Sequence, residues 1–393
     1  MTSAFARPTV LALLLGASSL APAAPYLPSD ASKVVERLPT RTDPVQRELR
    51  ALRAAASANP TDVRSAAVLA RRYIEQARVE GDPRYLGYAQ AALGPWWSQP
   101  APPDAILVLR ATLRQSTHHF KEALDDLSIV VRNNSDNAQA WITRATVLTV
   151  LGDFTAAKAS CMRLYSRAPE LVVQTCLSGI GSISGEARTS YDQLKTALAR
   201  AADADPDIRI WTITLLAEMA VRLGESAAAQ DWFKQAMALG EPDSYLLAAY
   251  ADFLLDQQRA PEVVRLLKDK TRIDSLLLRY AIALKATGGA EAARQRDALT
   301  QRFDAAMLRG DTVHQREQAR FELALRGDAR AAVRLAKLNW AVQKEPADLR
   351  ILAETAAASG DAEATELVRQ WIAKAKLEDA SVAPTLRKLK VAA

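Results

Sequence analysis

Few side chains in this sequence could support acid–base or metal chemistry. The 393 residues include three histidines, His118, His119 and His314. His118 and His119 are adjacent, so on a helix their side chains would point about 100° apart and could not share a metal ion as an i, i+4 pair does. We expect both at a turn before Phe120, exposed to solvent. The histidines therefore predict no metal site.

The short motifs of common active sites are also missing. The sequence has no His-Glu-x-x-His, Cys-x-x-Cys or Gly-x-Ser-x-Gly pattern. The glycine-rich run 179–185 lacks the Gly-Lys-Ser/Thr ending of a phosphate-binding loop, and we interpret it as a loop between two helices. We therefore predict that the protein is not an enzyme and uses no metal or cofactor.

The only two cysteines, Cys161 and Cys176, are placed to form a disulfide bond. Cys161 lies eight residues before Pro169 and Cys176 seven residues after it, so they come level if the flanking helices are antiparallel. Packed helices have axes about 8–10 Å apart, which allows the Cα separation of roughly 4.4–6.8 Å that a disulfide needs. Two buried free thiols and a redox-active pair are the alternatives.

The elements that must position these residues follow a repeat of 34 residues between Ala70 and Pro169. Four columns of residues recur at this spacing, two of them made only of alanine. The columns are Tyr73, Leu107 and Trp141; Ala77, Ala111 and Ala145; Leu86, Phe120 and Phe154; and Ala89, Ala123 and Ala157. Alanine and leucine favour helices, so each repeat is expected to be helical.

The repeat resembles the tetratricopeptide repeat (TPR) family. The matching residues are Trp141, Ala145, Leu151, Gly152, Phe154, Ala157 and Pro169. The resemblance implies an all-α fold, a right-handed α-solenoid of antiparallel helix pairs. The register slips by about three residues between Pro169 and Pro206 and returns at Ile210, and we count about eight pairs in total.

The N-terminal residues predict export. Arg7, the apolar run 10–20 and the small residues 21–24 have the pattern of a secretory signal peptide. No later run reaches the roughly 20 apolar residues of a membrane span. We expect a periplasmic or secreted protein. The expected parts are a signal peptide (1–24), a linker (25–42), the solenoid (43–378), and a C-terminal capping helix or tail (379–393).

The charge distribution does not favour a nucleic-acid partner. The formal net charge is +6, and basic residues cluster only weakly, at Arg387, Lys388 and Lys390. Dispersed charges of this kind usually form a solvated surface. We therefore expect a protein or peptide partner.

The resemblance to TPR proteins also implies a partner-binding groove, lined by the first helix of each repeat. The inward positions are Gln139, Ile142, Thr146, Trp211, Thr214, Glu218, Arg222, Tyr245 and Asp252. Trp211 and Tyr245 could anchor a partner, since aromatic side chains supply much of interface energy, or they could be core residues. The adjacent Trp96 and Trp97 leave the same two alternatives open. The groove lacks the set of Lys, Arg and Asn by which some TPR domains hold a terminal carboxylate, so we do not expect that activity.

These observations favour an exported TPR scaffold or adaptor that binds a protein or peptide, for example as an envelope assembly factor. The alternative hypothesis is a subunit, catalytic or not, of an envelope carbohydrate or cell-wall enzyme system. The third hypothesis is a purely structural oligomer.

Overall fold

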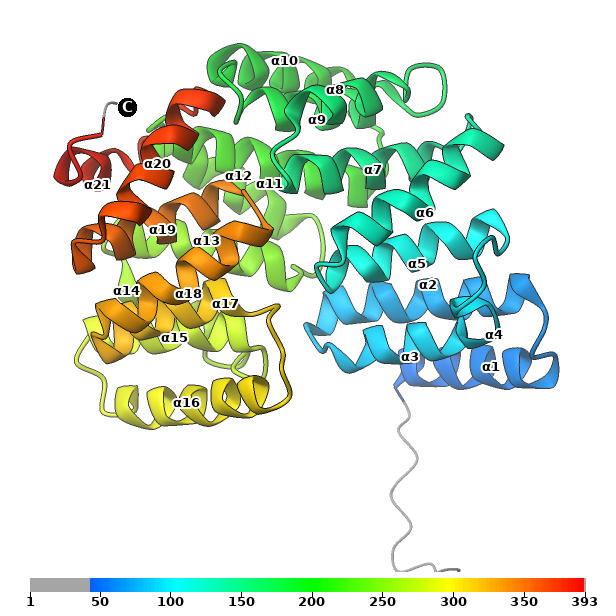
Figure 1. The fold of residues 1–393 in the computed structure, drawn as a ribbon, viewed down its shortest axis with the longest axis horizontal. Coiled ribbons are helices and arrows are strands. Elements are labelled where there is room, and N and C mark those ends of the chain that lie inside the picture. The colour runs from blue at the N-terminus through cyan, green and yellow to red at the C-terminus, as the bar shows by residue number, and fades with distance from the viewer. Residues whose placement is uncertain (1–42, 392–393) are drawn as a thin grey trace, which may run out of the picture. The chain divides into compact units, whose positions relative to one another are not determined.

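The computed structural model describes residues 43–391, and the statements below concern these residues. The chain divides into two units, Met1–Arg47 and Glu48–Ala393. The predicted signal peptide and linker lie outside the described residues. The second unit consists of helices joined by short turns (Figure 1). None of the described helices is long and apolar enough to cross a membrane.

Nine pairs of successive helices pack against each other in the described part of the chain. The pairs are α2 (Val63–Glu80) with α3 (Arg84–Ala92), α5 (Asp104–Ser116) with α6 (Phe120–Asn133), α7 (Ala138–Val150) with α8 (Phe154–Met162), α9 (Glu170–Gly181) with α10 (Ala187–Arg200), α11 (Pro206–Arg222) with α12 (Ser226–Ala238), α13 (Ser244–Asp256) with α14 (Ala260–Leu267), α15 (Asp274–Ala286) with α16 (Ala292–Leu308), α17 (Gln315–Phe321) with α18 (Ala329–Val342), and α19 (Pro346–Ser359) with α20 (Ala362–Ala375). The described chain is thus an all-α solenoid of TPR-like helix pairs, as the repeat predicted.

Three short or flanking helices complete the described chain. They are α1 (Pro44–Ala58), α4 (Gly94–Trp97) and α21 (Ala383–Lys388). α1 begins with Pro44 in its first position, and the Asp43 carboxylate accepts a hydrogen bond from the backbone N–H of Val45 at 2.9 Å. A π-helical turn (Glu322–Arg326) continues α17.

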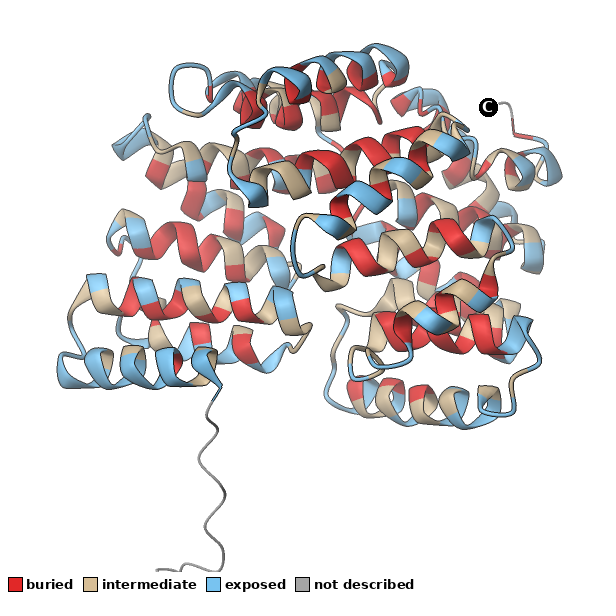
Figure 2. Cartoon of the chain, turned by 180° about the vertical axis from the view of Figure 1, so that it is seen from behind, coloured by how far each residue is buried: buried red, intermediate tan, exposed pale blue. Residues whose placement is uncertain are grey.

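The alanine columns explain why the pairs pack closely. Ala89, Ala123 and Ala157 are fully buried, because each lies where the second helix of a pair packs on its neighbours. A larger side chain there would push the helices apart. In Figure 2 the buried positions follow the faces on which helices touch, and the exposed positions lie opposite.

The glycine-rich run is helical for longer than expected. α9 continues through Gly179 to Gly181, and only residues 182–186 form the turn before α10. Gly181 packs against Ser190 of α10, where a Cβ atom would clash. The loop prediction for 179–185 was therefore wrong at its start, because a glycine can also mark close helix packing.

The predicted disulfide is confirmed. Cys161 of α8 is bonded to Cys176 of α9, with a Cα–Cα distance of 5.8 Å. Both cysteines are buried, and Leu164 and Val173 pack with them in one apolar cluster. The bond joins two successive helix pairs, α7/α8 and α9/α10.

Residues 371–380, which we call the closing segment, return to pairs much earlier in the chain. Trp371 covers Gly152, the turn between α7 and α8, and its ring meets Phe154 edge-on at 5.9 Å. Gly152 has a φ of +76°, which glycine adopts without strain. The turn glycine therefore provides both the backbone shape and the space for the indole ring.

The next two pairs meet the closing segment in the same way. A Cβ atom on Gly185, between α9 and α10, would lie 3.1 Å from Cβ of Lys376, and one on Gly224, between α11 and α12, would lie 3.4 Å from Ala380. The backbone N–H of Ala380 donates to the carbonyl of Arg222 at 2.7 Å. The closing segment thus crosses the turns of three successive pairs in order.

Beyond the closing segment, α21 packs into the last part of the core. Leu386 on α21 and Val382 just before it are buried with residues of α18 to α20. The described residues beyond 379 thus form a short packed helix where a capping helix or tail was expected.

Candidate functional site

A cavity of about 480 Å³ lies among the first helices of several pairs. Its best-defined wall is one face of α11, which contributes Trp211, Leu215, Glu218 and Arg222. These residues are three or four positions apart, so they share one face of the helix. The aromatic residue is at one end of this face and the charged residues are at the other.

Six other elements complete the lining. α13 supplies Tyr245 and Asp252, and α15 supplies Arg279. The remaining lining residues come from α7, α9, α17 and the start of α19. They include Ile142, Thr146, Val150, Thr175, Cys176, Ile180, Arg316, Glu317, Glu345, Pro346 and Ala347. The cavity is thus apolar toward α7 and α9 and charged toward α15, α17 and α19.

Most of the predicted groove residues line this cavity. They are Ile142, Thr146, Trp211, Glu218, Arg222, Tyr245 and Asp252. Trp211 and Tyr245 are 40% and 61% exposed, so neither is a core residue. That these residues bind a partner stays a prediction.

Two predicted groove residues do not line the cavity. Thr214 is only 5% exposed, since it precedes the lining residue Leu215 and so points about 100° away, into the helix packing. Gln139 is exposed outside the cavity, and its amide donates to the Thr143 hydroxyl at 3.2 Å. The inward assignment was therefore wrong for these two.

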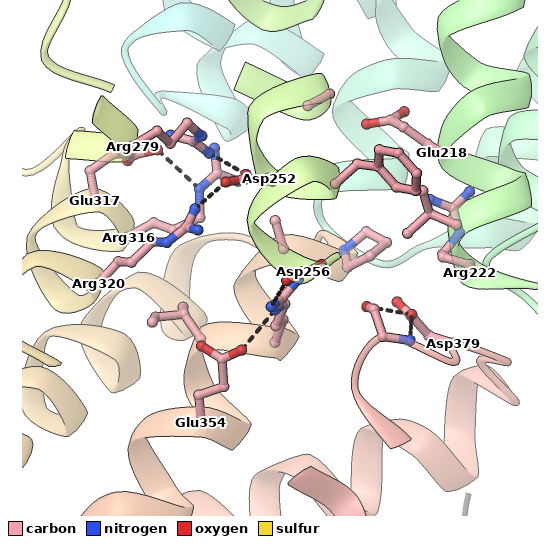
Figure 3. Close-up of a pocket in the computed structure, with 18 of the residues that line it drawn as sticks. Glu218, Arg222, Asp252, Asp256, Arg279, Arg316, Glu317, Arg320, Glu354 and Asp379 are labelled. Carbon is pink, nitrogen blue, oxygen red and sulfur yellow. Dashed lines mark hydrogen bonds and ion pairs between the residues drawn. The ribbon is translucent and has the colours of Figure 1, made fainter. Parts of the chain in front are cut away.

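The carboxylate of Asp252 is held by two arginines. Arg279 of α15 and Arg320 of α17 each donate to it at 2.6 Å (Figure 3). Burial by itself would raise the pKa of Asp252, but the two guanidinium groups hold that pKa well below its usual range. Asp252 therefore ties three helices together, a role that the sequence did not reveal.

The wall formed by α17 and α19 was also not predicted. Arg316 lies 3.1 Å from Glu345, 3.3 Å from Asp348 and 3.4 Å from Glu317. Desolvation raises the pKa of Glu345, and the positive charge of Arg316 opposes that change. The repeat signal fades after residue 290, so no spacing in the sequence places these residues beside α11.

A smaller cavity of about 170 Å³ shares lining residues with the larger one (Figure 3). At its base Arg350 of α19 donates to both oxygens of Asp256, at 2.6 and 2.7 Å, and to Glu354 at 2.7 Å. This ion-pair group links α13 to α19. It therefore fixes the wall opposite α11.

No family model and no curated protein matches this chain. Among solved structures, it is similar to a tetratricopeptide repeat protein from Parabacteroides merdae, at 15% identity over 61% of this chain and 92% of that one, with a TM-score of 0.44. It is also similar to the APC/C hetero-tetramer Cut9–Hcn1, at 13% identity over 82% of this chain and 59% of that one, with a TM-score of 0.47.

A third similar solved structure is the human IFIT1 dimer with m7Gppp-AAAA, at 12% identity over 89% of this chain and 87% of that one, with a TM-score of 0.47. Similarities this distant do not indicate a function. The assignment rests on the 34-residue spacing together with the stacked helix pairs. The chain is a TPR-like solenoid.

Within the solenoid, Glu218 and Arg222 differ from the other charged residues of the larger cavity. In the described chain neither has a partner of opposite charge within 4.0 Å, whereas the others form ion pairs. Glu218 accepts a hydrogen bond from the Tyr245 hydroxyl at 2.7 Å, and Arg222 donates to Ser182 at 3.0 Å. Burial raises the pKa of Glu218, and Arg222 opposes that change.

The histidines of the solenoid lie outside both cavities. His118 is at the turn between α5 and α6 as predicted, but it is half-buried, because its ring stacks on Phe120 with centroids 5.3 Å apart. Burial lowers the pKa of His118, and the charge of Arg316 lowers it further. The exposed position expected for His118 was therefore wrong, whereas His119 is exposed.

The two adjacent tryptophans of the solenoid lie in α4. Trp96 is only 7% exposed, and the ring of the half-buried Trp97 lies under the guanidinium of Arg114 at 5.9 Å. The backbone carbonyl of Trp97 accepts a hydrogen bond from Arg110 at 2.6 Å. This arrangement favours the packing interpretation for Trp96.

Proposed function

We propose that this TPR-like solenoid is a non-catalytic scaffold that binds a short protein or peptide segment in the larger cavity. The observation that supports it is the exposure of Trp211 and Tyr245 inside a cavity of about 480 Å³. Sites that enclose small ligands typically have volumes of about 300–1,000 Å³. Large aromatic side chains that remain exposed in such a site are typical binding anchors.

The walls restrict what can bind. α17 and α19 face α11 across the cavity and are fixed by the ion pairs of Asp252 and of Arg350. A long extended segment would need a continuous open groove. The partner therefore inserts only a few residues, such as a loop tip or a chain end.

We further propose that the protein acts outside the cytoplasm, as an adaptor or assembly factor of the cell envelope. The signal-peptide pattern of residues 1–24 and the Cys161–Cys176 bond support it, because structural disulfides persist in oxidising compartments. Mass spectrometry of the protein from its native source should find an N-terminus near Ala24 or Pro25. An intact Met1 would contradict export.

Binding in the cavity is tested by recovering partners with the native protein and with Trp211→Ala and Tyr245→Ala. Both variants should lose at least about 90% of the recovered partner, because each removes an exposed anchor. Their melting temperatures should change little, since neither ring is buried. Tyr165→Ala is the matched control, because Tyr165 is 44% exposed but lies outside the cavity.

Three results would contradict the proposal. The first is full partner recovery by both cavity variants. The second is turnover of a small substrate by the pure protein, abolished by a cavity variant, which would indicate an enzyme. The third is tight binding of single-stranded RNA at physiological salt that depends on the same residues, which would indicate a nucleic-acid partner.

A further inference from the structure

Glu218 is the carboxylate of the larger cavity that has no ionic partner among the described residues. Asp252, Glu317 and Glu345 each lie within ion-pair distance of an arginine. Arg222, one turn away from Glu218 on α11, also has no ion pair in the described chain, but its Nε is buried and its Nη2 is bonded to Ser182.

The environment of Glu218 is arranged for a positive charge. The Tyr245 hydroxyl donates to Oε1 of Glu218 at 2.7 Å, which fixes the carboxylate, while no described residue donates to Oε2. The negative charge of Glu218, and more weakly that of Glu345, raises the pKa of Tyr245 well above its usual value. The raised pKa of Tyr245 indicates a negative electrostatic potential at its hydroxyl group.

Two exposed aromatic side chains line the same cavity as this carboxylate. Trp211 lies two turns before Glu218 on the same face of α11, and Tyr245 belongs to the adjacent helix α13. Aromatic faces attract ammonium and guanidinium groups through the negative potential above the ring. A carboxylate that shares its cavity with two exposed aromatic side chains thus offers charge, a hydrogen-bond acceptor and apolar surface to one bound side chain.

We propose that Glu218, Tyr245 and Trp211 form a site for a cationic group, the ammonium or guanidinium of a lysine or arginine side chain in the bound segment. This inference rests on the proposed function and adds the chemistry of the partner. The methylene groups of such a side chain would pack on the rings, and its charged end would reach Oε2 of Glu218.

The test uses the capped tripeptide acetyl-Ala-Lys-Ala-amide and its analogue with norleucine in place of lysine, which keeps the shape and removes the charge. Affinities for the full chain are measured by ligand-observed NMR titration. The lysine peptide should bind about tenfold more tightly than the norleucine peptide. Glu218→Gln should abolish this difference by weakening only the lysine peptide.

The control variant is Glu241→Gln, which removes an exposed carboxylate outside both cavities and should leave both affinities unchanged. Trp211→Ala is a second variant that tests the site without changing its net charge, and it should weaken the lysine peptide at least fivefold. Circular dichroism melting verifies that each variant is folded.

Equal affinity for the two peptides, no binding of the lysine peptide, or equal losses in Glu218→Gln and Glu241→Gln would each overturn the inference. Binding of n-butylammonium as tight as that of the lysine peptide would confirm the cation chemistry but assign the site to free amines. The lysine peptide could show no binding in the titration while Trp211→Ala still recovers no partner from the native source. That result would contradict the cation site and leave the scaffold function supported.

Discussion

The sequence indicated the position of Asp252 in the groove but not its role in holding three helices together. The resemblance to TPR proteins implied an inward position for Asp252, and Asp252 does line the cavity. Its two arginine partners lie on α15 and α17, outside its own repeat, and Arg320 belongs to the part of the chain where the repeat signal fades. A one-residue error in register rotates a helical position by about 100°, which explains the failure at Thr214.

Asp252→Asn should destabilise the protein by about 2–3 kcal/mol at neutral pH, because it leaves two partly buried arginines without their carboxylate. The folded-state pKa of Asp252 is below its unfolded value, so its stabilisation is present above about pH 4 and is lost as pH falls further. The difference between native and variant should therefore shrink toward pH 2. Urea unfolding of the native protein and of Asp252→Asn across this pH range measures the difference in stability.

Asp125→Asn provides the comparison. Asp125 pairs with Lys121 on an exposed surface of α6, and such pairs contribute little. Its loss should cost less than about 0.5 kcal/mol at any pH. Equal effects of the two substitutions would contradict the structural role of Asp252.

At the scale of the elements, the sequence was most informative where proline and glycine mark helix ends. α1 ends at Ala58, just before Asn59 and Pro60, and α2 ends at Glu80, just before Gly81. The repeats from α2 to α8 were located by the residues that recur every 34 positions. α15, α17 and α19 form the far wall of the cavity through ion pairs between residues distant in the sequence, which no local pattern predicts.

The turn between α7 and α8 provides a test of how the closing segment is held. Gly152→Ala should cost at least about 2 kcal/mol more than Gly360→Ala. Both glycines have φ near +70°, so both substitutions carry a strain of about 1–2 kcal/mol. A Cβ atom on Gly152 also overlaps the Trp371 ring, whereas none of the atoms described lies within 4 Å of one on Gly360.

Urea unfolding of the two variants measures this difference, and limited proteolysis should cut Gly152→Ala faster within residues 371–380. Equal stabilities would mean that the Trp371 ring moves aside without cost, and that the closing segment is not held at this turn.

For the second unit as a whole, long-range contacts change how a repeat protein should unfold. In a simple solenoid each repeat touches only its neighbours, so the ends can open independently. Here the backbone N–H of Lys344 donates to the carbonyl of Val150 at 2.8 Å, and the closing segment covers the turns of three earlier pairs. Opening the later pairs therefore exposes surface on earlier ones.

The described helices should accordingly unfold in one cooperative step. Urea transitions followed by far-UV circular dichroism and by tryptophan fluorescence should coincide, with equal midpoints and equal m-values. Two separated transitions, with the pairs from α2 to α8 unfolding apart from the others, would contradict this expectation.

The late position of the cavity wall in the chain also sets an order of events as the chain folds. α7 to α13 precede α19 in the sequence, so they can pack before α19 is available. Until then the face of α11 with Trp211 and Glu218 has no wall opposite it. A segment captured at this stage is enclosed when residues 346–380 pack, so we expect a chain that is still folding to load a longer segment than the completed protein admits.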